Sequence, residues 1–153
     1  MKEKIVSLKT AKLLKEIGFN PDTPHGWYKK YTSKDKYKWI YKDYVGVSHF
    51  YFSEDLCYDD CENFSIPETH LNEKEDYISA PTQCLAQKWL REEYNINITI
   101  VNVKITVTVY RYIIGESSEE EVGEFDSYEE ALEKGLQEAI KIIKDEQDIQ
   151  KIQ

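Results

Sequence analysis

Apolar residues recur at helical spacing in three stretches of the chain. In the first, Ser7 can cap a helix in which Leu14 and Ile17 lie on one face. Gly18 stands where a helix end favours a left-handed residue, and Phe19 can then fold back onto Leu14, as in a Schellman ending. These positions predict a short, capped helix near the N-terminus.

The second stretch reads YISAPTQCLAQKWLREEYNI, from Tyr77 to Ile96. Pro81 suits the first turn of a helix, because the N–H that proline lacks has no helical partner there. Apolar and polar side chains then separate onto two faces. The apolar stripe comprises Leu85, Ala86, Trp89, Leu90 and Tyr94, and the polar ridge includes Gln83, Gln87 and Arg91. We interpret this segment as a helix that packs on a core, with the ridge as a weaker candidate for contact with a partner.

The third stretch opens with a capping box, in which Ser127 accepts from the amide of Glu130 and Glu130 reaches back to the cap. The apolar face that follows comprises Tyr128, Ala131, Leu132, Leu136, Ala139, Ile140 and Ile143. Gly135 lies inside this helix, where glycine costs up to about 1 kcal/mol relative to alanine. Either another backbone approaches closely there or the glycine is simply tolerated. Residues 147–153 are expected to fray.

Alternation with a period of two predicts strands in two further regions. Tyr37, Trp39 and Tyr41 alternate with lysines, and the preceding TSKD predicts a hairpin turn from a strand near 27–31. An apolar strand is expected at 45–52.

In the second region, the isoleucines of 96–100 and the apolar residues of 103–109 fall on opposite parity. A change of parity predicts a bulge or tight turn near 101–102. Residues 115–123 read as a hairpin loop that leads to a short strand ending near Phe125.

Together these elements predict an α+β fold, in which three helices pack on one face of a mainly antiparallel sheet. A length of 153 residues suits one domain. Neither a repeat nor a linker divides the chain. We therefore expect a single α+β domain over 1–146 and a frayed tail over 147–153.

Composition narrows the setting of this domain. The net charge of −9 opposes binding to nucleic acid and to anionic membranes. No apolar run approaches the about 18 residues that a membrane span needs, and the N-terminus lacks the apolar core of a signal peptide. Three cysteines without an export signal indicate reduced thiols. We expect a cytoplasmic protein.

Three segments resemble one group of proteins. They read SLKTAKLLKEIGF, SAPTQCLAQKWLREEYNI and SYEEALEKGLQEAIKII, and together they make up about a third of the chain. The second and third carry the patterns APTQxLxQKWLRE and YEEALEKGLxEA, and they resemble uncharacterised small proteins of phages and of integrated elements (prophages) in gut bacteria. The resemblance implies a bacterial or viral cytoplasmic setting. It implies no activity, cofactor or site residue.

Two neighbouring segments of opposite charge form the candidate binding surface. Residues 27–44 hold six lysines and two acids among Trp and Tyr rings, a combination that can grip single-stranded nucleic acid. Strict alternation also fits a hairpin with one buried aromatic face and one solvated lysine face. Residues 54–76 hold nine acids and one lysine. Such a segment can dock a basic protein or remain a solvated loop.

Signals for metal binding and catalysis are weak. Candidate zinc ligands are Cys57, Cys61, His49 and His70, and candidate ligands for a hard cation are Asp59, Asp60 and Glu62. The first set lacks a regularly spaced second pair, and the second lacks the spacing of an EF-hand. Cys84 is expected to be a small buried hydrophobe. With no nucleophile motif and no phosphate loop, we expect no metal site, no cofactor and no enzymatic activity.

We hypothesise that the protein is a non-catalytic accessory protein that binds a macromolecular partner, a host or viral protein. Representative residues of the binding surface are Trp39, Tyr41, Asp59 and Asp60. The alternative is a small-ligand binder, in which rings stack a nucleotide-like group and lysines neutralise its phosphates. The sequence argues against a nucleic-acid or membrane partner and leaves self-association open.

Overall fold

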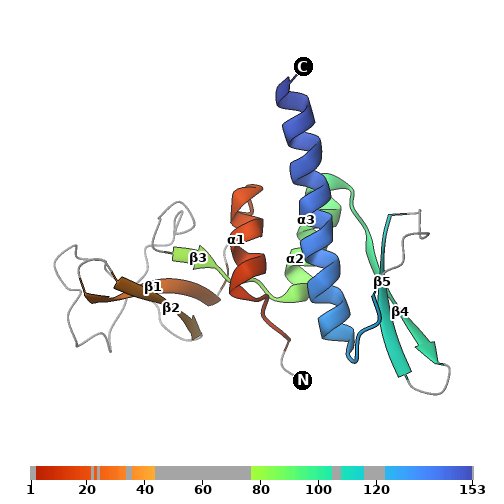
Figure 1. The fold of residues 1–153 in the computed structure, drawn as a ribbon, viewed down its shortest axis with the longest axis horizontal. Helices are drawn as coiled ribbons and strands as arrows, with labels where there is room; N and C mark the ends of the chain where they lie inside the picture. Colours follow the sequence, from red (N-terminus) through yellow and green to blue (C-terminus); the bar gives the residue numbers. More distant parts are fainter. Residues whose placement is uncertain are drawn as a thin grey trace. The chain divides into compact units, whose positions relative to one another are not determined.

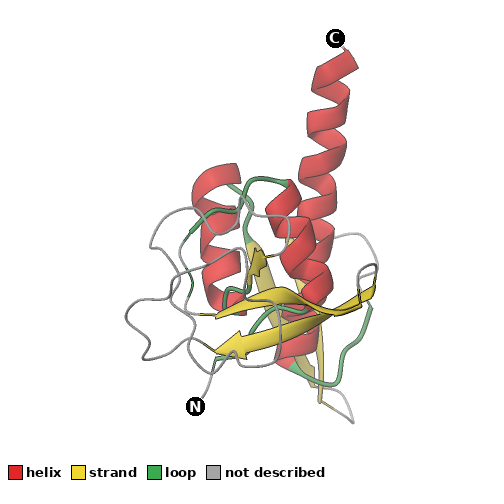
Figure 2. Cartoon of the chain, turned by 90° about the vertical axis from the view of Figure 1, so that its left-hand side faces the viewer, coloured by secondary structure: helices red, strands yellow, loops and turns green. Residues whose placement is uncertain are grey.

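The computed structural model describes residues 3–21, 23, 25–33, 36–43, 77–104, 108–115 and 123–152. These residues form three helices and five strands (Figure 1), coloured by type in Figure 2. The elements are α1 (Leu8–Glu16), β1 (His25–Ser33), β2 (Lys36–Asp43), β3 (Tyr77–Ser79), α2 (Gln83–Tyr94), β4 (Ile98–Lys104), β5 (Thr108–Ile114) and α3 (Tyr128–Ile152). Every described strand pair is antiparallel. The α+β class is therefore confirmed.

The described strands form two sheets, and not the one sheet that the sequence predicts. One has the order β2-β1-β3, and the other is the hairpin of β4 and β5. The chain also divides into two compact units, a sheet unit of Asn20–Ala80 and a helical unit of Met1–Phe19 with Pro81–Gln153. A period of two shows that strands exist but not which strands pair. Two compact units can belong to one domain, so the single domain over 1–146 stays a prediction.

A short antiparallel bridge joins the two chain segments of the helical unit. The N–H of Val6 donates to the carbonyl of Pro81 at 3.0 Å, and the N–H of Gln83 donates to the carbonyl of Lys4 at 2.8 Å. The chain leaves this unit after Phe19 and re-enters it at Pro81. The bridge therefore fixes the re-entry point of the chain beside its N-terminal segment.

Both predicted ends of α1 are confirmed. The Oγ atom of Ser7 accepts from the N–H of Thr10 at 3.2 Å. At the other end Gly18 has φ +88°, and the N–H of Phe19 donates to the carbonyl of Leu14 at 2.9 Å. This is the Schellman bond, and Phe19 and Leu14 are both fully buried beside it.

The helix after Pro81 is confirmed, with two corrections. Thr82 is the N-cap and accepts from the N–H of Leu85 at 3.2 Å, so that Pro81 precedes the helix and does not lie in its first turn. Cys84 is exposed and not buried. It lies two residues from the buried Ala86, and successive residues turn by about 100°, which places it on the far side of the helix.

The predicted apolar face of α3 is confirmed apart from its first residue. The buried residues are Ala131, Leu132, Leu136, Ala139, Ile140 and Ile143. The N–H of Glu130 donates to the Oγ of Ser127 at 3.2 Å, as in the predicted cap. Tyr128, however, is 42% exposed. It begins the helix one turn before the packed part of the face starts.

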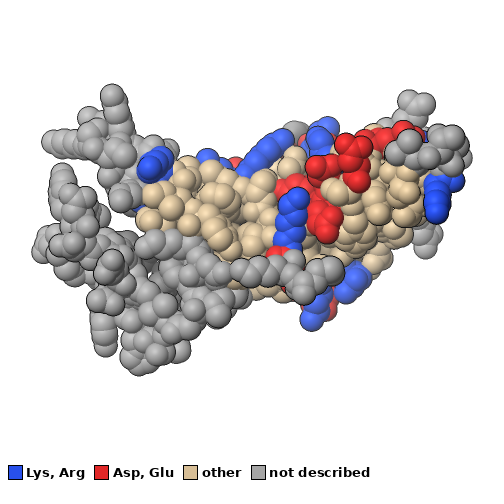
Figure 3. Space-filling view, turned by 90° about the horizontal axis from the view of Figure 1, so that it is seen from below, with Lys and Arg blue, Asp and Glu red and all other residues tan. Residues whose placement is uncertain are grey.

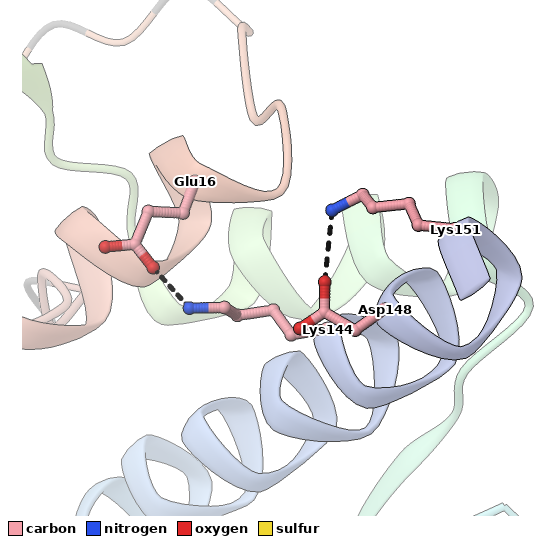
Figure 4. A network of polar contacts seen from close by, with 4 residues as sticks. All are labelled: Glu16, Lys144, Asp148 and Lys151. Atoms are coloured by element: carbon pink, nitrogen blue, oxygen red, sulfur yellow. Dashed lines mark hydrogen bonds and ion pairs between the residues drawn. The ribbon is translucent and has the colours of Figure 1, made fainter.

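The predicted fraying of 147–153 is wrong for 147–152, which continue α3. The tail contains three glutamines and one lysine, which are good helix formers. Lys144 pairs with Glu16 of α1 at 2.6 Å, and Lys151 pairs with Asp148 one turn earlier at 3.0 Å (Figure 4). The hydrogen bond to Glu16 raises the pKa of Lys144. These contacts favour the helix up to its last turn.

The predicted break near 101–102 is also wrong. β4 is continuous and pairs with β5 from Ile98 opposite Ile114 to Lys104 opposite Thr108, without a shift of register. Residues 105–107, between the two strands, lie outside the described residues. The change of parity arises because both faces of β4 carry apolar residues, with Val101 and Val103 half-buried on the face opposite to Ile98.

Gly135 allows α3 to lie close against this hairpin. α3 contacts both β4 and β5. A Cβ atom at Gly135 would lie 2.8 Å from the Cγ2 atom of Ile98 and 3.2 Å from the Cβ atom of Tyr112. The structure shows a close approach at this glycine, but by the side chains of Ile98 and Tyr112 and not by another backbone. The finer prediction, that all three helices pack on one face of one sheet, is not confirmed.

Replacing Gly135 by alanine is expected to destabilise the protein, although alanine is the better helix former. Helix propensity favours alanine by up to about 1 kcal/mol, whereas an extra methyl in a filled contact costs about 1–3 kcal/mol. Denaturant unfolding followed by circular dichroism should show a net loss. Lys134→Ala, at the exposed neighbouring position, should change the free energy of unfolding by less than about 0.5 kcal/mol. A Gly135→Ala variant as stable as the wild type would show that the glycine is merely tolerated.

Candidate functional site

One face of the sheet unit collects aromatic side chains from β1 and β2. Residues directly opposite each other in an antiparallel pair point to the same face. The register places Trp27 opposite Tyr41, and Lys29 opposite Trp39. His25, two residues before Trp27, shares that face. We call His25, Trp27, Lys29, Trp39 and Tyr41 the aromatic face.

The side chains of the aromatic face contact one another. Tyr41 meets Trp27 edge to face, with ring centroids 5.4 Å apart, and stacks with His25 at 6.1 Å. The Nζ atom of Lys29 lies 5.7 Å from the centre of the Trp39 ring, within the range of a cation–π contact. Tyr41 is 36% exposed and the other four residues are half-buried. The face is therefore neither a sealed core nor fully solvated.

Trp27 lies on the central strand of the sheet, between β2 and β3. On one side it lies opposite Tyr41, and on the other it lies opposite Ile78 of β3, which is buried. The indole Nε1 atom of Trp27 is buried and has no hydrogen-bond partner among the described residues. An unpaired buried N–H costs about 1–3 kcal/mol. The packing of Trp27 between two strands must offset that cost.

The structure brings two of the four predicted site residues together. Trp39 and Tyr41 lie on the same face of β2, whereas Asp59 and Asp60 lie outside the described residues. The predicted strand at 45–52 and the candidate zinc ligands in 49–70 also lie outside them. Within the described ranges, no group of three or more His, Cys, Asp or Glu side chains is placed to hold a metal ion.

A second polar feature, which the sequence did not reveal, lies in the helical unit. The Oε1 atom of Glu133 accepts from the N–H of Ser7 at 2.9 Å and from the hydroxyl of Thr10 at 2.5 Å. Its Oε2 atom accepts from the Nε2 of Gln83 at 2.9 Å. The Nε2 of Gln137 donates to the Thr10 hydroxyl oxygen at 3.0 Å. We call these five residues the Glu133 cluster.

The Glu133 cluster ties the beginnings of two helices to the third. In a capping box, a glutamate of the same helix takes the N–H of the cap residue. α1 has no acid in its first turn, and Glu133 of α3 takes the N–H of Ser7 in its place. Gln83 also donates to the backbone carbonyl of Glu129 at 3.0 Å. Both carboxylate oxygens are thus engaged within the protein, which indicates a structural role.

The polar ridge of α2 is therefore largely structural. Gln83 was expected to face solvent but is 3% exposed. Gln87 is half-buried, and its Nε2 donates to the carbonyl of Ile98 at 2.6 Å. Only Arg91 of the three is exposed. The segment from Tyr77 to Ile96 supports the fold, and its ridge is not the candidate site.

Comparison with known proteins adds no relative: no protein-family model, curated protein or solved structure matches the chain. Among the helices of the described residues, none combines the length and the apolar character that crossing a membrane requires.

The pKa of Glu133 makes the role of the cluster testable by pH. Burial raises this pKa, but the hydrogen bonds from Thr10, Ser7 and Gln83 together lower it by more, so that it lies below the ordinary 4.5. A carboxyl whose pKa is lower in the folded state stabilises the fold fully above its unfolded pKa. That contribution is lost as the pH falls through the folded pKa.

We therefore expect the stability of the wild type to fall steeply as the pH drops below about 4.5. Glu133→Gln should lose about 1–3 kcal/mol near neutral pH, because the charged acceptor is gone, and its stability should fall less steeply in acid. Thermal unfolding between about pH 3 and pH 7 measures both effects. Glu146→Gln, at an exposed position of α3, should follow the wild type. Parallel pH profiles for Glu133→Gln and the wild type would contradict this role.

Proposed function

We propose that the protein is a non-catalytic accessory protein that binds a partner protein through the aromatic face. The observation that carries the proposal is the exposed Tyr41, whose ring is held in place by Trp27 and His25 of the neighbouring strand. Aromatic anchors supply much of the binding energy at protein interfaces. Tyr41 and the nearby Trp39 are of that kind.

The way the rings are held supports binding. A side chain that is already ordered loses less conformational entropy when a partner docks, which leaves more of the contact energy as affinity. Tyr41 contacts two rings from β1, and Trp27 is in addition flanked by β3. The aromatic face is thus ordered by the sheet before any partner arrives.

A protein is a better match for this face than a planar ligand or a nucleic acid. The ammonium group of Lys29 lies over the ring of Trp39, so a base that stacked on that side of the ring would have to displace it. The net charge of −9 also opposes a polyanion. The nucleotide-like ligand of the alternative hypothesis therefore ranks second.

The acidic segment 54–76 extends the proposal. It follows β2 closely in sequence and carries nine acids, among them Asp59 and Asp60. Acidic charge attracts and orients a basic partner, while aromatic anchors supply the contact. The resemblance to proteins of phages and prophages supports a host or viral protein as the partner and a bacterial cytoplasm as the setting.

Truncating the aromatic face should release the partner. Tyr41→Ala and Trp39→Ala are each expected to weaken capture about 5- to 30-fold, as for interface positions that contribute about 1–2 kcal/mol. The measurement is affinity capture from bacterial lysate with quantitative mass spectrometry. Tyr128→Ala, which removes a comparably exposed ring of the helical unit, is the matched control, and circular dichroism verifies folding.

Two outcomes would overturn the proposal. The first is a captured set that Tyr41→Ala and Trp39→Ala leave unchanged, or that Tyr128→Ala reduces equally. The second is a rise in melting temperature with millimolar nucleotides, lost in Trp39→Ala, because a ligand that binds the folded state raises its stability. That result would favour the small-ligand alternative.

A further inference from the structure

Two backbone contacts show which way the peptide groups of the β4–β5 hairpin point. Tyr110 exchanges both of its hydrogen bonds with Phe125, at 2.9 and 3.0 Å, so its N–H and C=O point away from β4. Successive residues of a strand direct these groups to alternate sides. The N–H of Gly115 donates to the carbonyl of Asn97 at 2.9 Å. This bond agrees with the same alternation, because it joins two odd-numbered residues across the hairpin. The peptide N–H and C=O groups of odd-numbered residues therefore form the hydrogen bonds between the two strands. Those of the even-numbered residues of β4 point away from β5.

Three of these outward residues form an open edge. Ile98 is the first residue of β4 whose peptide groups point outward, and its carbonyl already accepts a hydrogen bond from the side chain of Gln87. At Ile100, Asn102 and Lys104, no described strand lies on the outer side, because the described neighbour of β4 is β5. We call Ile100, Asn102 and Lys104 the open edge.

Apart from Lys104 at its end, the open edge lacks the features that normally prevent strand pairing. Natural edge strands carry prolines, bulges or inward-pointing charges that block a further strand. β4 has no proline, and its one charged residue, Lys104, lies at its end. Its register with β5 contains no bulge. The edge is therefore competent to accept another strand.

We infer that the open edge binds a second copy of this chain, with β4 pairing antiparallel to β4 about a two-fold axis at Asn102. In this register Asn102 lies opposite Asn102 of the second copy, and Ile100 lies opposite its Lys104. All three open residues then find partners. Val101 faces Val103 of the second copy in a non-hydrogen-bonded pair, where side chains approach most closely. The contact uses the same surface on both copies, as two-fold dimers do.

The distribution of charge favours contact between two copies at the β4–β5 hairpin. At a net charge of −9, two copies repel each other over most of their surface. Residues 97–114 contain no acid, and of their two basic residues Arg111 is paired with Glu124. Figure 3 shows acidic side chains gathered in one place on the described surface seen from below, with basic side chains around them.

The remaining basic residue does not oppose the pairing. In the proposed register the two Lys104 residues are offset by four positions, or about 14 Å at about 3.4 Å per residue. That exceeds the screening length of about 8–10 Å at physiological salt. The strand contact is nevertheless smaller than the about 1,200 Å² of a standard stable interface. We therefore expect a dimer that forms and dissociates with concentration.

Sedimentation velocity of the full chain, from about 1 μM to about 1 mM, tests the inference with two variants. Asn102→Pro removes an outward N–H without removing a bond to β5, as proline on an edge strand can. Because each dimer loses this bond twice, the dissociation constant should rise at least about tenfold. Asn102→Ala keeps the N–H and should dimerise like the wild type.

Hydrogen exchange of the wild type gives a second readout and decides the question if Asn102→Pro does not fold. The amides of Ile100 and Asn102 should exchange slowly in concentrated samples and rapidly in dilute ones. Those of Val101 and Val103, bonded to β5, should be protected in both. If the protein is a monomer at every concentration, the inference is wrong. This holds whether the edge amides are protected from exchange by the chain itself or are open to water. A dimer that leaves these amides unprotected would also overturn the inference.

Discussion

The carboxylate of Glu133 is the interaction on which the helical unit depends. It receives donors from the start of α1 and the start of α2, and the amide of Gln83 has almost no access to water. Leaving one buried donor unpaired costs about 1–3 kcal/mol, a large part of the total stability of a domain. Gln83 follows Pro81, where the chain re-enters this unit. One half-buried carboxylate therefore positions three helices and the point at which the chain returns to them.

The two units use their side chains differently. The helical unit uses its polar side chains internally: Gln83 binds α3, and Gln87 binds β4. The sheet unit instead keeps Tyr41 exposed beside half-buried rings. Side chains that satisfy buried groups are not free to recognise a partner, whereas exposed, ordered rings are. This contrast is the reason for placing the proposed binding function on the aromatic face.

The predictions that succeeded rest on local interactions. The Schellman ending at Gly18, the cap at Ser127 and the stripe of α3 involve residues within a few positions of each other, and spacing alone reveals them. The Glu133 cluster joins α3 to residues 50 to 127 positions away in the sequence, and no local sequence pattern predicts it. Gln83 was misplaced because glutamine suits solvent and buried networks alike. The predicted break at 101–102 was wrong because one continuous strand carries apolar residues on both faces. In the sequence, this pattern resembles the shift in alternation that a bulge produces. Trp39 and Tyr41 were correctly placed on one strand face, and the roles of Asp59 and Asp60 stay predictions.

The most direct test of this account is a double-mutant cycle between Glu133 and Gln83. The free energy of unfolding is measured for the wild type, Glu133→Ala, Gln83→Ala and the double variant. If the carboxylate holds α2 through Gln83, the two substitutions should be coupled by about 1–3 kcal/mol. Effects that add to within about 0.3–0.5 kcal/mol would show that the two side chains stabilise the protein independently, and would contradict the central role of Glu133.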